Sequence, residues 1–302
     1  MSVKAVGLDI GAEQVKAVAL HKRRQQCILS GVGLSAIPPG ANDEAVAQAV
    51  KAALREAGAG KNAAVCAAVG GPTVVVKGMR LPRTPLPRVL EAVRWSLQEH
   101  GLLPVSGAIL DAQVLSTATE GQMQLLAVCV PQELMDRRQR ILARAGVTPQ
   151  KMDVEPLALL NGVLAMQEGV MDDTLVLLSL APKAALVCVY HAAAGAPLIR
   201  YLQSPQQSTA AMIAEIRTAV AYFQAELEAE SALRLVYCGP QNIFTALKGE
   251  LQGLLALWNH HEDPTLFDPL ARLEGAQRLL LDGQSIEGSQ FTQAVGLAMR
   301  AL

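Results

Sequence analysis

The chain has 302 residues, of which 51% are hydrophobic and 18% are charged, and its 26 basic and 27 acidic side chains give a net charge of −1. This length is sufficient for a sizeable core and predicts two or three lobes. Because aromatic residues make up only 3% of the chain, it has neither the basic surface nor the stacking side chains by which proteins bind nucleic acid. We expect a compact soluble protein without a nucleic-acid partner.

Targeting and membrane-spanning segments are not predicted. Charged residues occupy the N-terminal region where a signal peptide needs an apolar core. The most apolar stretch, residues 174–199, is interrupted by Pro182 and Lys183, so each part is shorter than the roughly 20 residues of a spanning helix. The five cysteines are widely spaced, which indicates buried thiols rather than disulfides or a zinc site. These features favour a cytoplasmic protein with no transmembrane segment and no metal site.

Three strands are expected first, at residues 3–10, 14–20 and 26–34. The bend between the first two contains Asp9 and Gly11. A glycine there lets the backbone approach a ligand, and amides of such a turn can face an anion while the acid faces a hydrated cation. The pattern of the hairpin alone favours a plain turn, with a phosphate-binding turn as the functional alternative.

A helix and another strand complete the first domain. Asn42 or Asp43 can cap a helix that runs to about Ala57, and residues 63–69 form a short buried strand. Strands, helix and strand in this order indicate an α/β domain. The basic residues at 21–24 between the second and third strands predict a solvated turn, with contact to anionic lipid as the functional alternative.

The pattern changes after the glycines and proline at residues 70–72. Residues 73–81 alternate as a strand, and residues 88–99 have the spacing of an amphipathic helix. A strand at 125–130 and a helix that ends at Gly146 follow, and the four arginines of this helix predict its solvent-exposed face. This block predicts a small α/β subdomain inserted into the first domain.

Asp153 and Glu155 stand before a helix at residues 157–166 that begins with a proline. Capping and the helix dipole explain carboxylates at this place, and an acid near a bound phosphate is the functional alternative. The remaining elements follow the pattern of the first domain. They are expected at residues 174–181, 184–190, 197–202, 210–229, 235–240 and 291–302.

Both halves thus open with paired strands and a third strand, as in the actin-like fold shared by actin, sugar kinases and the cell-division protein FtsA. The chain also resembles the PilM family of type IV pilus assembly proteins in the order and spacing of its motifs, and the shorter MshI-like proteins of mannose-sensitive pilus systems. The motifs lie at residues 81–82, 91–95, 130–134, 153–159, 268–271 and 294–300. The match covers nearly the whole chain.

This resemblance implies an α/β, actin-like (ribonuclease H-like) fold with two lobes. The expected domains are residues 1–72 and 150–172 for the first lobe (1A), 73–149 for an inserted subdomain of the 1C type, and 173–302 for the second lobe (2A). In the family, a helical outer subdomain (2B) follows the third strand of the second lobe. Only residues 203–209 stand there in this chain, so we expect the outer subdomain to be missing.

The resemblance also implies a function, that of a cytoplasmic adaptor in a type IV pilus or type II secretion-like assembly machine. Such an adaptor is peripheral to the inner membrane because it binds the cytoplasmic tail of a PilN-like bitopic membrane protein, alongside other pilus assembly proteins. The tail binds between the inserted subdomain and the first lobe. The residues expected to line that groove are Met79, Leu81, Val93 and Leu97. The alternative is that they form the subdomain core, because apolar residues at strand and helix spacing usually pack together.

ATP is the usual ligand of the family. The positions expected to hold it are Asp9, Gly11, Lys16 and Gly239. However, residues 179–183 lack the acid that begins the family's second phosphate loop, Pro182 removes an amide donor, and Glu13 repels phosphate. Each lost charge-assisted hydrogen bond is worth about 1.5–3 kcal/mol. We therefore expect a degenerate nucleotide site with no catalytic residue and at best weak binding of ATP and magnesium.

An ATP-binding actin-like ATPase or a small-molecule kinase is the alternative function. A kinase needs an acid to orient the attacking hydroxyl and a metal to hold the phosphates, and Asp153 or Glu155 would serve as that acid. Residues 260–263, His-His-Glu-Asp, are metal-ligand types without the i, i+4 spacing of a helical site. They predict a polar loop.

Overall fold

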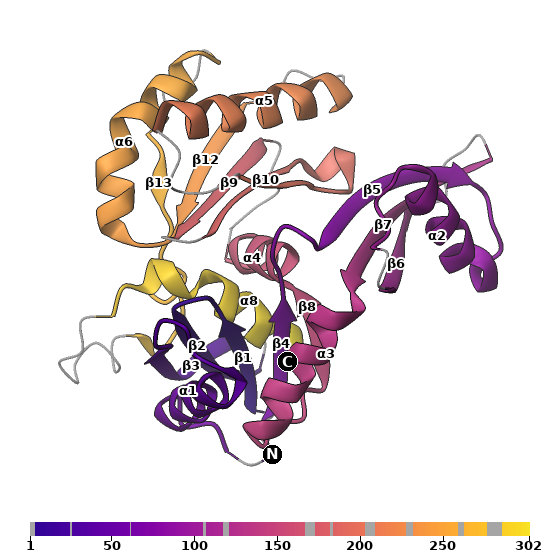
Figure 1. Cartoon of the computed structure of the whole chain (residues 1–302). Helices are drawn as coiled ribbons and strands as arrows, with labels where there is room; N and C mark the ends of the chain where they lie inside the picture. The colour runs from indigo at the N-terminus through magenta and orange to yellow at the C-terminus, as the bar shows by residue number, and fades with distance from the viewer. Residues whose placement is uncertain are drawn as a thin grey trace.

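The computed structural model describes residues 4–24, 26–60, 62–104, 107–116, 121–166, 173–181, 184–202, 209–227, 232–258, 263–276 and 286–302. Helices cover three separate sheets (Figure 1). The strand orders are β3-β2-β1-β4-β8, β11-β10-β9-β12-β13 and β5-β7-β6. The first two sheets repeat one plan, in which three antiparallel strands are followed by two parallel ones. The α/β class expected from the sequence is confirmed.

The first lobe is built around β1, which is buried along nearly its whole length because it is apolar and lies inside the sheet. Its elements are β1 (Lys4–Ile10), β2 (Gln14–Arg23), β3 (Gln26–Ala36), α1 (Asp43–Glu56), β4 (Ala64–Val69), α3 (Gln132–Arg144), β8 (Lys151–Val154) and α4 (Glu155–Leu164). As predicted, Asn42 caps α1, since its Oδ1 accepts a hydrogen bond of 3.0 Å from the Ala45 N–H. α1 and α3 cover one face of the sheet.

The second lobe has the same order of elements. They are β9 (Thr174–Ala181), β10 (Ala184–Tyr190), η2 (Ala192–Ala194), β11 (Leu198–Tyr201), α5 (Thr209–Leu227), β12 (Leu233–Cys238), α6 (Gln241–Ala256) and β13 (Thr265–Leu266). α5 and α6 pack against one face of its sheet (Figure 1). α4 of the first lobe covers the other face through Leu159, Leu160 and Val163. The short connection expected at 203–209 lies outside the described residues except for Thr209, so the missing outer subdomain stays a prediction.

The last helix crosses back to the first lobe. η3 (Gly288–Phe291) and α8 (Thr292–Ala301) belong by sequence to the segment 173–302, but α8 packs against β1 and α4. Glycines permit this contact, because a Cβ on Gly7 would stand 1.9 Å from the Ala294 carbonyl oxygen, and one on Gly296 would stand 1.9 Å from that of Ala158. Packing therefore divides the chain differently from the expected domain boundary at this end.

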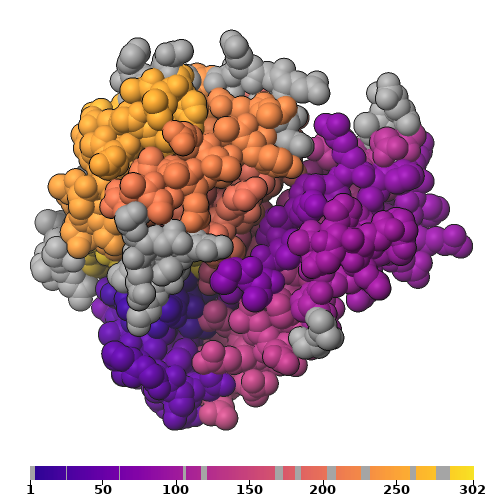
Figure 2. Space-filling model, turned by 45° about the horizontal axis from the view of Figure 1, so that its top comes forward, coloured from indigo at the N-terminus to yellow at the C-terminus, as the bar shows by residue number. Residues whose placement is uncertain are grey.

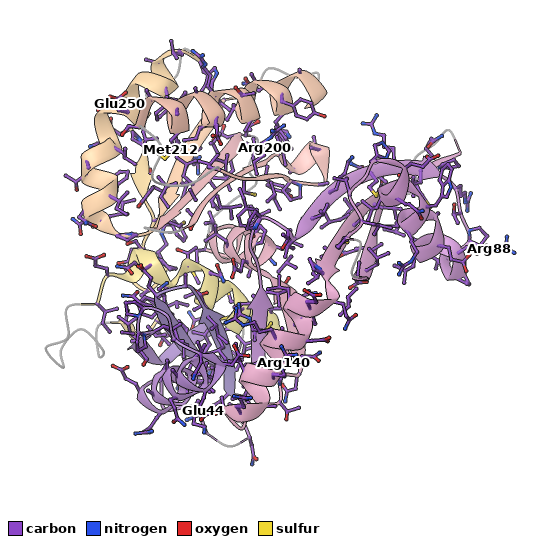
Figure 3. All side chains as sticks on the ribbon, in the orientation of Figure 1. Glu44, Arg88, Arg140, Arg200, Met212 and Glu250 are labelled. Carbon is purple, nitrogen blue, oxygen red and sulfur yellow. The ribbon has the colours of Figure 1, made fainter. Side chains whose placement is uncertain are left out.

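The inserted block is a three-stranded sheet that projects beside the two lobes (Figure 1). Its elements are β5 (Val75–Pro82), η1 (Leu86–Arg88), α2 (Val89–Glu99), β6 (Ala108–Ser116) and β7 (Gln122–Pro131). α2 covers one face of the sheet. In Figure 3, Arg88 lies at the outer end of this block, away from both lobes. The sequence predicted β5, α2 and part of β7, but not β6.

Hydrogen bonds among the described residues join the second lobe to the loop after β4 and to the inserted block. The Gly71 N–H donates to the Tyr201 hydroxyl oxygen at 3.0 Å, and the Gln124 side-chain amide of the inserted block donates to the Ala194 carbonyl at 2.6 Å. Between these contacts the surface is hollowed by a cavity of about 640 Å³ lined by β5, β11 and α5 (Figure 2). No helix among the residues that the structure describes is long and apolar enough to cross a membrane.

Candidate functional site

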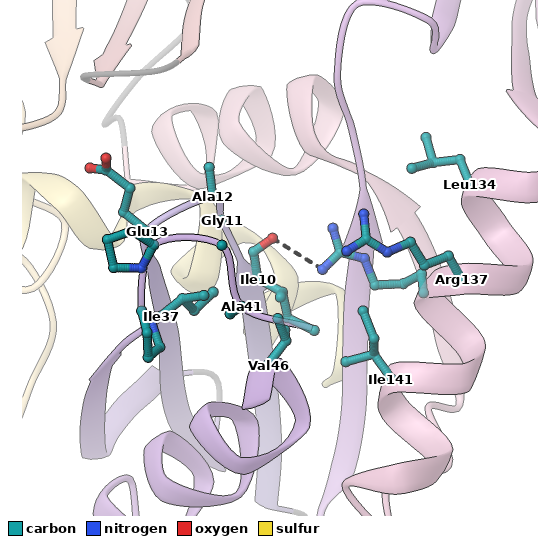
Figure 4. Close-up of a pocket in the computed structure, with 14 residues that line it drawn as sticks. Ile10, Gly11, Ala12, Glu13, Ile37, Ala41, Val46, Leu134, Arg137 and Ile141 are labelled. Carbon is teal, nitrogen blue, oxygen red and sulfur yellow. Dashed lines mark hydrogen bonds between the residues drawn. The ribbon is translucent and has the colours of Figure 1, made fainter. Parts of the chain in front are cut away.

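A groove of about 370 Å³ lies between α3 and the turn that joins β1 to β2 (Figure 4). We call it the α3 groove. Aliphatic side chains from β1, the loop after β3, α1 and α3 form much of its wall. They are Ile10, Ile37, Val46, Leu134 and Ile141. A concave surface of this kind, apolar with a few polar groups, is typical of a binding site.

Ion pairs fix the two helices that border the α3 groove. The Arg137 Nε donates to Asp43 Oδ1 at 2.9 Å, and Arg144 lies 3.7 Å from Glu44. Both acids stand in the first turn of α1, where the helix dipole favours negative charge. The hydrogen bond from Arg137 lowers the pKa of Asp43. These two ion pairs fix α1 relative to α3 on the outer side of the groove, and the core between the helices fixes them beneath it.

Arg138 supplies the polar group inside the α3 groove. Its guanidinium donates a hydrogen bond of 3.0 Å to the Ile10 carbonyl, at the end of β1 (Figure 4). Burial lowers the pKa of Arg138, and the carboxylates of Glu155 and Asp9 oppose this shift. The sequence predicted all four arginines of α3 on the solvent face, and for Arg138 this is wrong. A guanidinium has five N–H donors, so one acceptor leaves further donors for a bound ligand.

A second site lies in the cleft between the lobes, with a volume of about 280 Å³. It brings together all four residues expected to hold nucleotide, namely Asp9, Gly11, Lys16 and Gly239. They meet because β1, β2 and β12 end at the same cleft. Ser179 lines it too, while Pro182 and Lys183 of the expected second loop lie outside the described residues.

Asp9 is engaged by other side chains of the chain itself. Lys16 Nζ lies 3.5 Å from Asp9 Oδ2, and the Gln293 side-chain amide donates to Asp9 Oδ1 at 2.8 Å. The aspartate is only 6% exposed. Both carboxylate oxygens therefore have partners within the protein. Gln293 stands on α8 and was not foreseen from the sequence, because it lies 284 residues from Asp9.

Glu155 lines the same cleft from the first turn of α4. Its carboxyl group lies against Gly70, where an added Cβ would meet it at 1.9 Å. Burial and the nearby Asp9 raise the pKa of Glu155 to about 7, against the opposing effect of Arg138 and Lys16. With Asp9 and Glu13, three acids line this cleft.

Asp153, the other acid considered from the sequence, does not line the cleft. Its Oδ2 lies 3.3 Å from Arg300 Nε of α8, and its Oδ1 accepts a hydrogen bond from the Val154 N–H. Burial raises its pKa. Of the two acids, only Glu155 is placed where a phosphate-orienting role could arise.

The four residues expected to bind a partner lie together, but in a core. Met79, Val93 and Leu97 are 7%, 0% and 1% exposed, and Leu81 is partly buried with them between α2 and the sheet. This packing is the alternative that the sequence left open. Three of the four side chains are therefore not accessible to a partner, and their role as pocket-lining residues stays a prediction.

The sequence missed most residues of the α3 groove. Leu134 alone falls within a recognised motif, at residues 130–134. Ile37 and Val46 come from the loop after β3 and from α1, and nothing in their local pattern indicates that they face α3. Within the part of the chain that the structure describes, no group of three or more histidine, cysteine, aspartate or glutamate side chains is placed to hold a metal ion. Residues 260–262 of the polar loop lie outside it.

Comparison with known proteins gives a consistent result. The sequence model of a family described as type IV pilus assembly protein PilM matches residues 7–193. A search of the curated proteins finds no match. The solved structure of a PilM-PilN type IV pilus biogenesis complex is similar with a TM-score of 0.80 and 23% identity, covering 98% of each chain.

A second solved structure is that of a Bacteroides thetaiotaomicron protein with an actin-like ATPase fold and unknown function. It is 9% identical, with a TM-score of 0.51, and the match covers 92% of this chain and 95% of that one. At these levels of identity the two structures are evidence of fold alone. They confirm the actin-like fold expected from the sequence.

Proposed function

The chain belongs to the PilM family of type IV pilus assembly proteins, and on this premise we propose that it is a non-catalytic adaptor for the tail of a PilN-like inner-membrane protein. It acts at the cytoplasmic side of that membrane, within the assembly machine. The observation that carries the proposal is the α3 groove, which lies between α3 and the turn that joins β1 to β2 in the first lobe. The similar PilM-PilN complex supports the choice of partner.

The chemistry of the α3 groove suits a short extended peptide. Its aliphatic walls accept a branched apolar side chain, and its volume of about 370 Å³ matches a few residues. The free donors of Arg138 lie beside these walls and can bind a main-chain carbonyl of the peptide. A peptide that offers an aliphatic anchor and a correctly spaced acceptor is therefore the expected ligand.

A binding experiment tests this placement. A fluorescein-labelled peptide of the cytoplasmic tail of the PilN-like protein is titrated with the chain, and anisotropy is recorded. Leu134→Asp places a carboxylate on the partly exposed wall of the α3 groove, so we expect binding at least about tenfold weaker, or about 1.4 kcal/mol. Leu257→Asp is the matched control, because Leu257 is a 64% exposed leucine at the end of α6. It should bind as the unmodified chain does.

Leu81→Asp separates the two placements of the partner site. If the tail lies against the inserted block, a folded Leu81→Asp variant loses binding and Leu134→Asp retains it. If the tail lies in the α3 groove, the order is reversed. Circular dichroism of each variant establishes that a loss of binding is not a loss of fold.

We further propose that the cleft between the lobes is a degenerate nucleotide site. Three features support this: Asp9 is engaged by Lys16 and Gln293, Glu13 and Glu155 add two further acids, and α6 begins after Pro240, which has no N–H to offer an anion. Calorimetry with MgATP should give no low-micromolar affinity. Low-micromolar affinity that Asp9→Ala abolishes would contradict this and favour the ATPase or kinase alternative.

A further inference from the structure

The outer edge of β6 is a strand edge without a partner. β6 is nine residues long and pairs with β7 on one side only, since it ends the order β5-β7-β6. No residue of β6 is buried, although Ile109, Leu110, Val114 and Leu115 are large and apolar. Figure 1 shows β6 on the side of the inserted block away from β5. Of the described strands, none pairs with this edge.

The backbone groups that face outward can be assigned. The Gly107 carbonyl accepts a hydrogen bond of 3.1 Å from the Gln132 N–H at the β7 side. Because backbone groups alternate sides along a strand, positions 109, 111 and 113 pair with β7, and positions 110, 112 and 114 point outward. The hydrogen bond of the Ala112 N–H supports this assignment, since the N–H donates to Asp111 Oδ1 at 2.8 Å and not to β7.

Little protects this edge against pairing. Natural proteins usually shorten such edges or place lysine, proline or a bulge on them. β6 contains neither lysine nor proline, and its register shift lies at its last residues, between Val114 and Ser116. The side chains of Leu110, Ala112 and Val114 share the face that α2 covers and remain partly exposed. An apolar face therefore continues to the open edge.

We propose that β6 pairs antiparallel with β6 of a second copy of the chain, about a two-fold axis at Ala112. The Ala112 N–H exchanges its hydrogen bond to Asp111 Oδ1 for one across the axis, and the two three-stranded sheets then form one continuous sheet, joined by about six main-chain hydrogen bonds. This register sets Leu110 opposite Val114 of the partner subunit. It also sets Asp111 opposite Gln113 of the partner subunit, so that the carboxylate gains an amide donor.

The sequence of β6 selects this register over its neighbours. A shift of two residues in one direction places Asp111 opposite Asp111 of the partner subunit, and like charges directly opposite each other destabilise a pair. The shift in the other direction carries Leu110 to the partner subunit's Ser116, beyond the register shift of β6. Only the register centred on Ala112 is complementary to itself along the strand. The proposed dimer contact involves neither the α3 groove nor the cleft between the lobes, so it is independent of the proposed function.

The first test uses sedimentation velocity of the full chain from low-micromolar to several hundred micromolar. The unmodified chain should form dimers as its concentration rises. Ala112→Pro removes the outward N–H without breaking a bond to β7, and proline is tolerated on such an edge. We expect its dimer to be at least tenfold weaker, whereas Ala112→Ser, which retains the N–H, should dimerise as before. Circular dichroism checks that both variants fold.

The second test addresses the register. Gln113→Lys places an ammonium group opposite Asp111 of the partner subunit and should tighten the dimer, while Gln113→Glu places a carboxylate there and should weaken it. Added salt should reduce the difference between the two variants. A chain that stays monomeric throughout, an Ala112→Pro variant that dimerises normally, or two Gln113 variants of equal affinity would each overturn the proposal. A monomeric chain would leave the edge to a strand of another protein.

Discussion

Glu155 illustrates how one side chain acquires its properties from residues distant in the sequence. Its carboxyl group lies against Gly70 of the loop after β4, and its pKa responds to the charges of Asp9 on β1, Lys16 on β2 and Arg138 on α3. The sequence placed an acid before a proline-started helix, which local capping already explains. Its raised pKa depends on burial and on Asp9, and neither follows from the local pattern.

The raised pKa predicts a pH-dependent stability. Because the folded chain holds the Glu155 proton up to about pH 7 and the unfolded chain releases it near its ordinary pKa of about 4.3, the free energy of unfolding falls as pH rises between these values. Glu155→Gln removes this contribution. In urea unfolding we expect the variant to gain about 1–3 kcal/mol relative to the unmodified chain between pH 5 and pH 8.

Glu91→Gln is the matched control for this prediction, since Glu91 is an exposed carboxylate on α2. Its stability should follow the pH profile of the unmodified chain. If the free energy of unfolding of Glu155→Gln depends on pH as that of the unmodified chain does, the Glu155 carboxyl group is solvated in the folded protein and the prediction is wrong.

At the scale of elements, glycines decide how α8 packs. α8 crosses from the second lobe and lies directly on β1 because Gly7 has no side chain. Gly7→Ala would bring a Cβ within 1.9 Å of the Ala294 carbonyl and 2.3 Å of the Ala298 N. Both neighbours are backbone atoms and cannot move aside, so we expect the free energy of unfolding to fall by about 2 kcal/mol or more.

Gly249→Ala on α6 is the opposite case. No atom lies within 4 Å of the position where its Cβ would stand, and alanine favours a helix interior over glycine by about 0.5–1 kcal/mol. Thermal or urea unfolding should therefore show a small gain in stability. If both alanine variants change stability equally, close packing of α8 is not the cause of the Gly7 effect.

Helices with a clear period were predicted, and other elements were missed. α1 and α2 bury one stripe each, and the sequence placed both. α6 was missed because Gly249 and Gly253 interrupt its pattern. β6 was missed although its residues 110–114 alternate between partly buried apolar and exposed polar side chains. Arg138 was assigned to the solvent because helical spacing alone does not distinguish a solvent-exposed face from one that borders a groove.

At the scale of the whole molecule, two hydrogen bonds tie the second lobe to the loop after β4 and to the inserted block, in addition to the packing of α4 against its sheet. The Gln124 amide donates to Ala194, and the Gly71 N–H donates to Tyr201. We expect the double variant Gln124→Ala, Tyr201→Phe to lose about 1 kcal/mol for each hydrogen bond. Amide hydrogen exchange should become faster in β5 and β11 and stay unchanged in β1.

Gln48→Ala is the control for this prediction, because the Gln48 amide donates to Glu44 within α1 and joins no two parts of the chain. Faster exchange throughout the double variant would indicate global destabilisation instead. Unchanged exchange in β5 and β11 would show that packing around the cavity between them holds the lobes without these bonds.

Local pattern was sufficient for the α/β class and for the hairpin of β1 and β2, and the family resemblance for the four residues that meet at the cleft, because strand order in this fold brings the ends of β1, β2 and β12 to one place. The engagement of Asp9 by Gln293, the inward turn of Arg138, the burial of Met79 and the open edge of β6 were decided by tertiary structure. Each depends on which surfaces come together across hundreds of residues. Hydrophobic period indicates that a side chain is buried, but not which neighbour buries it.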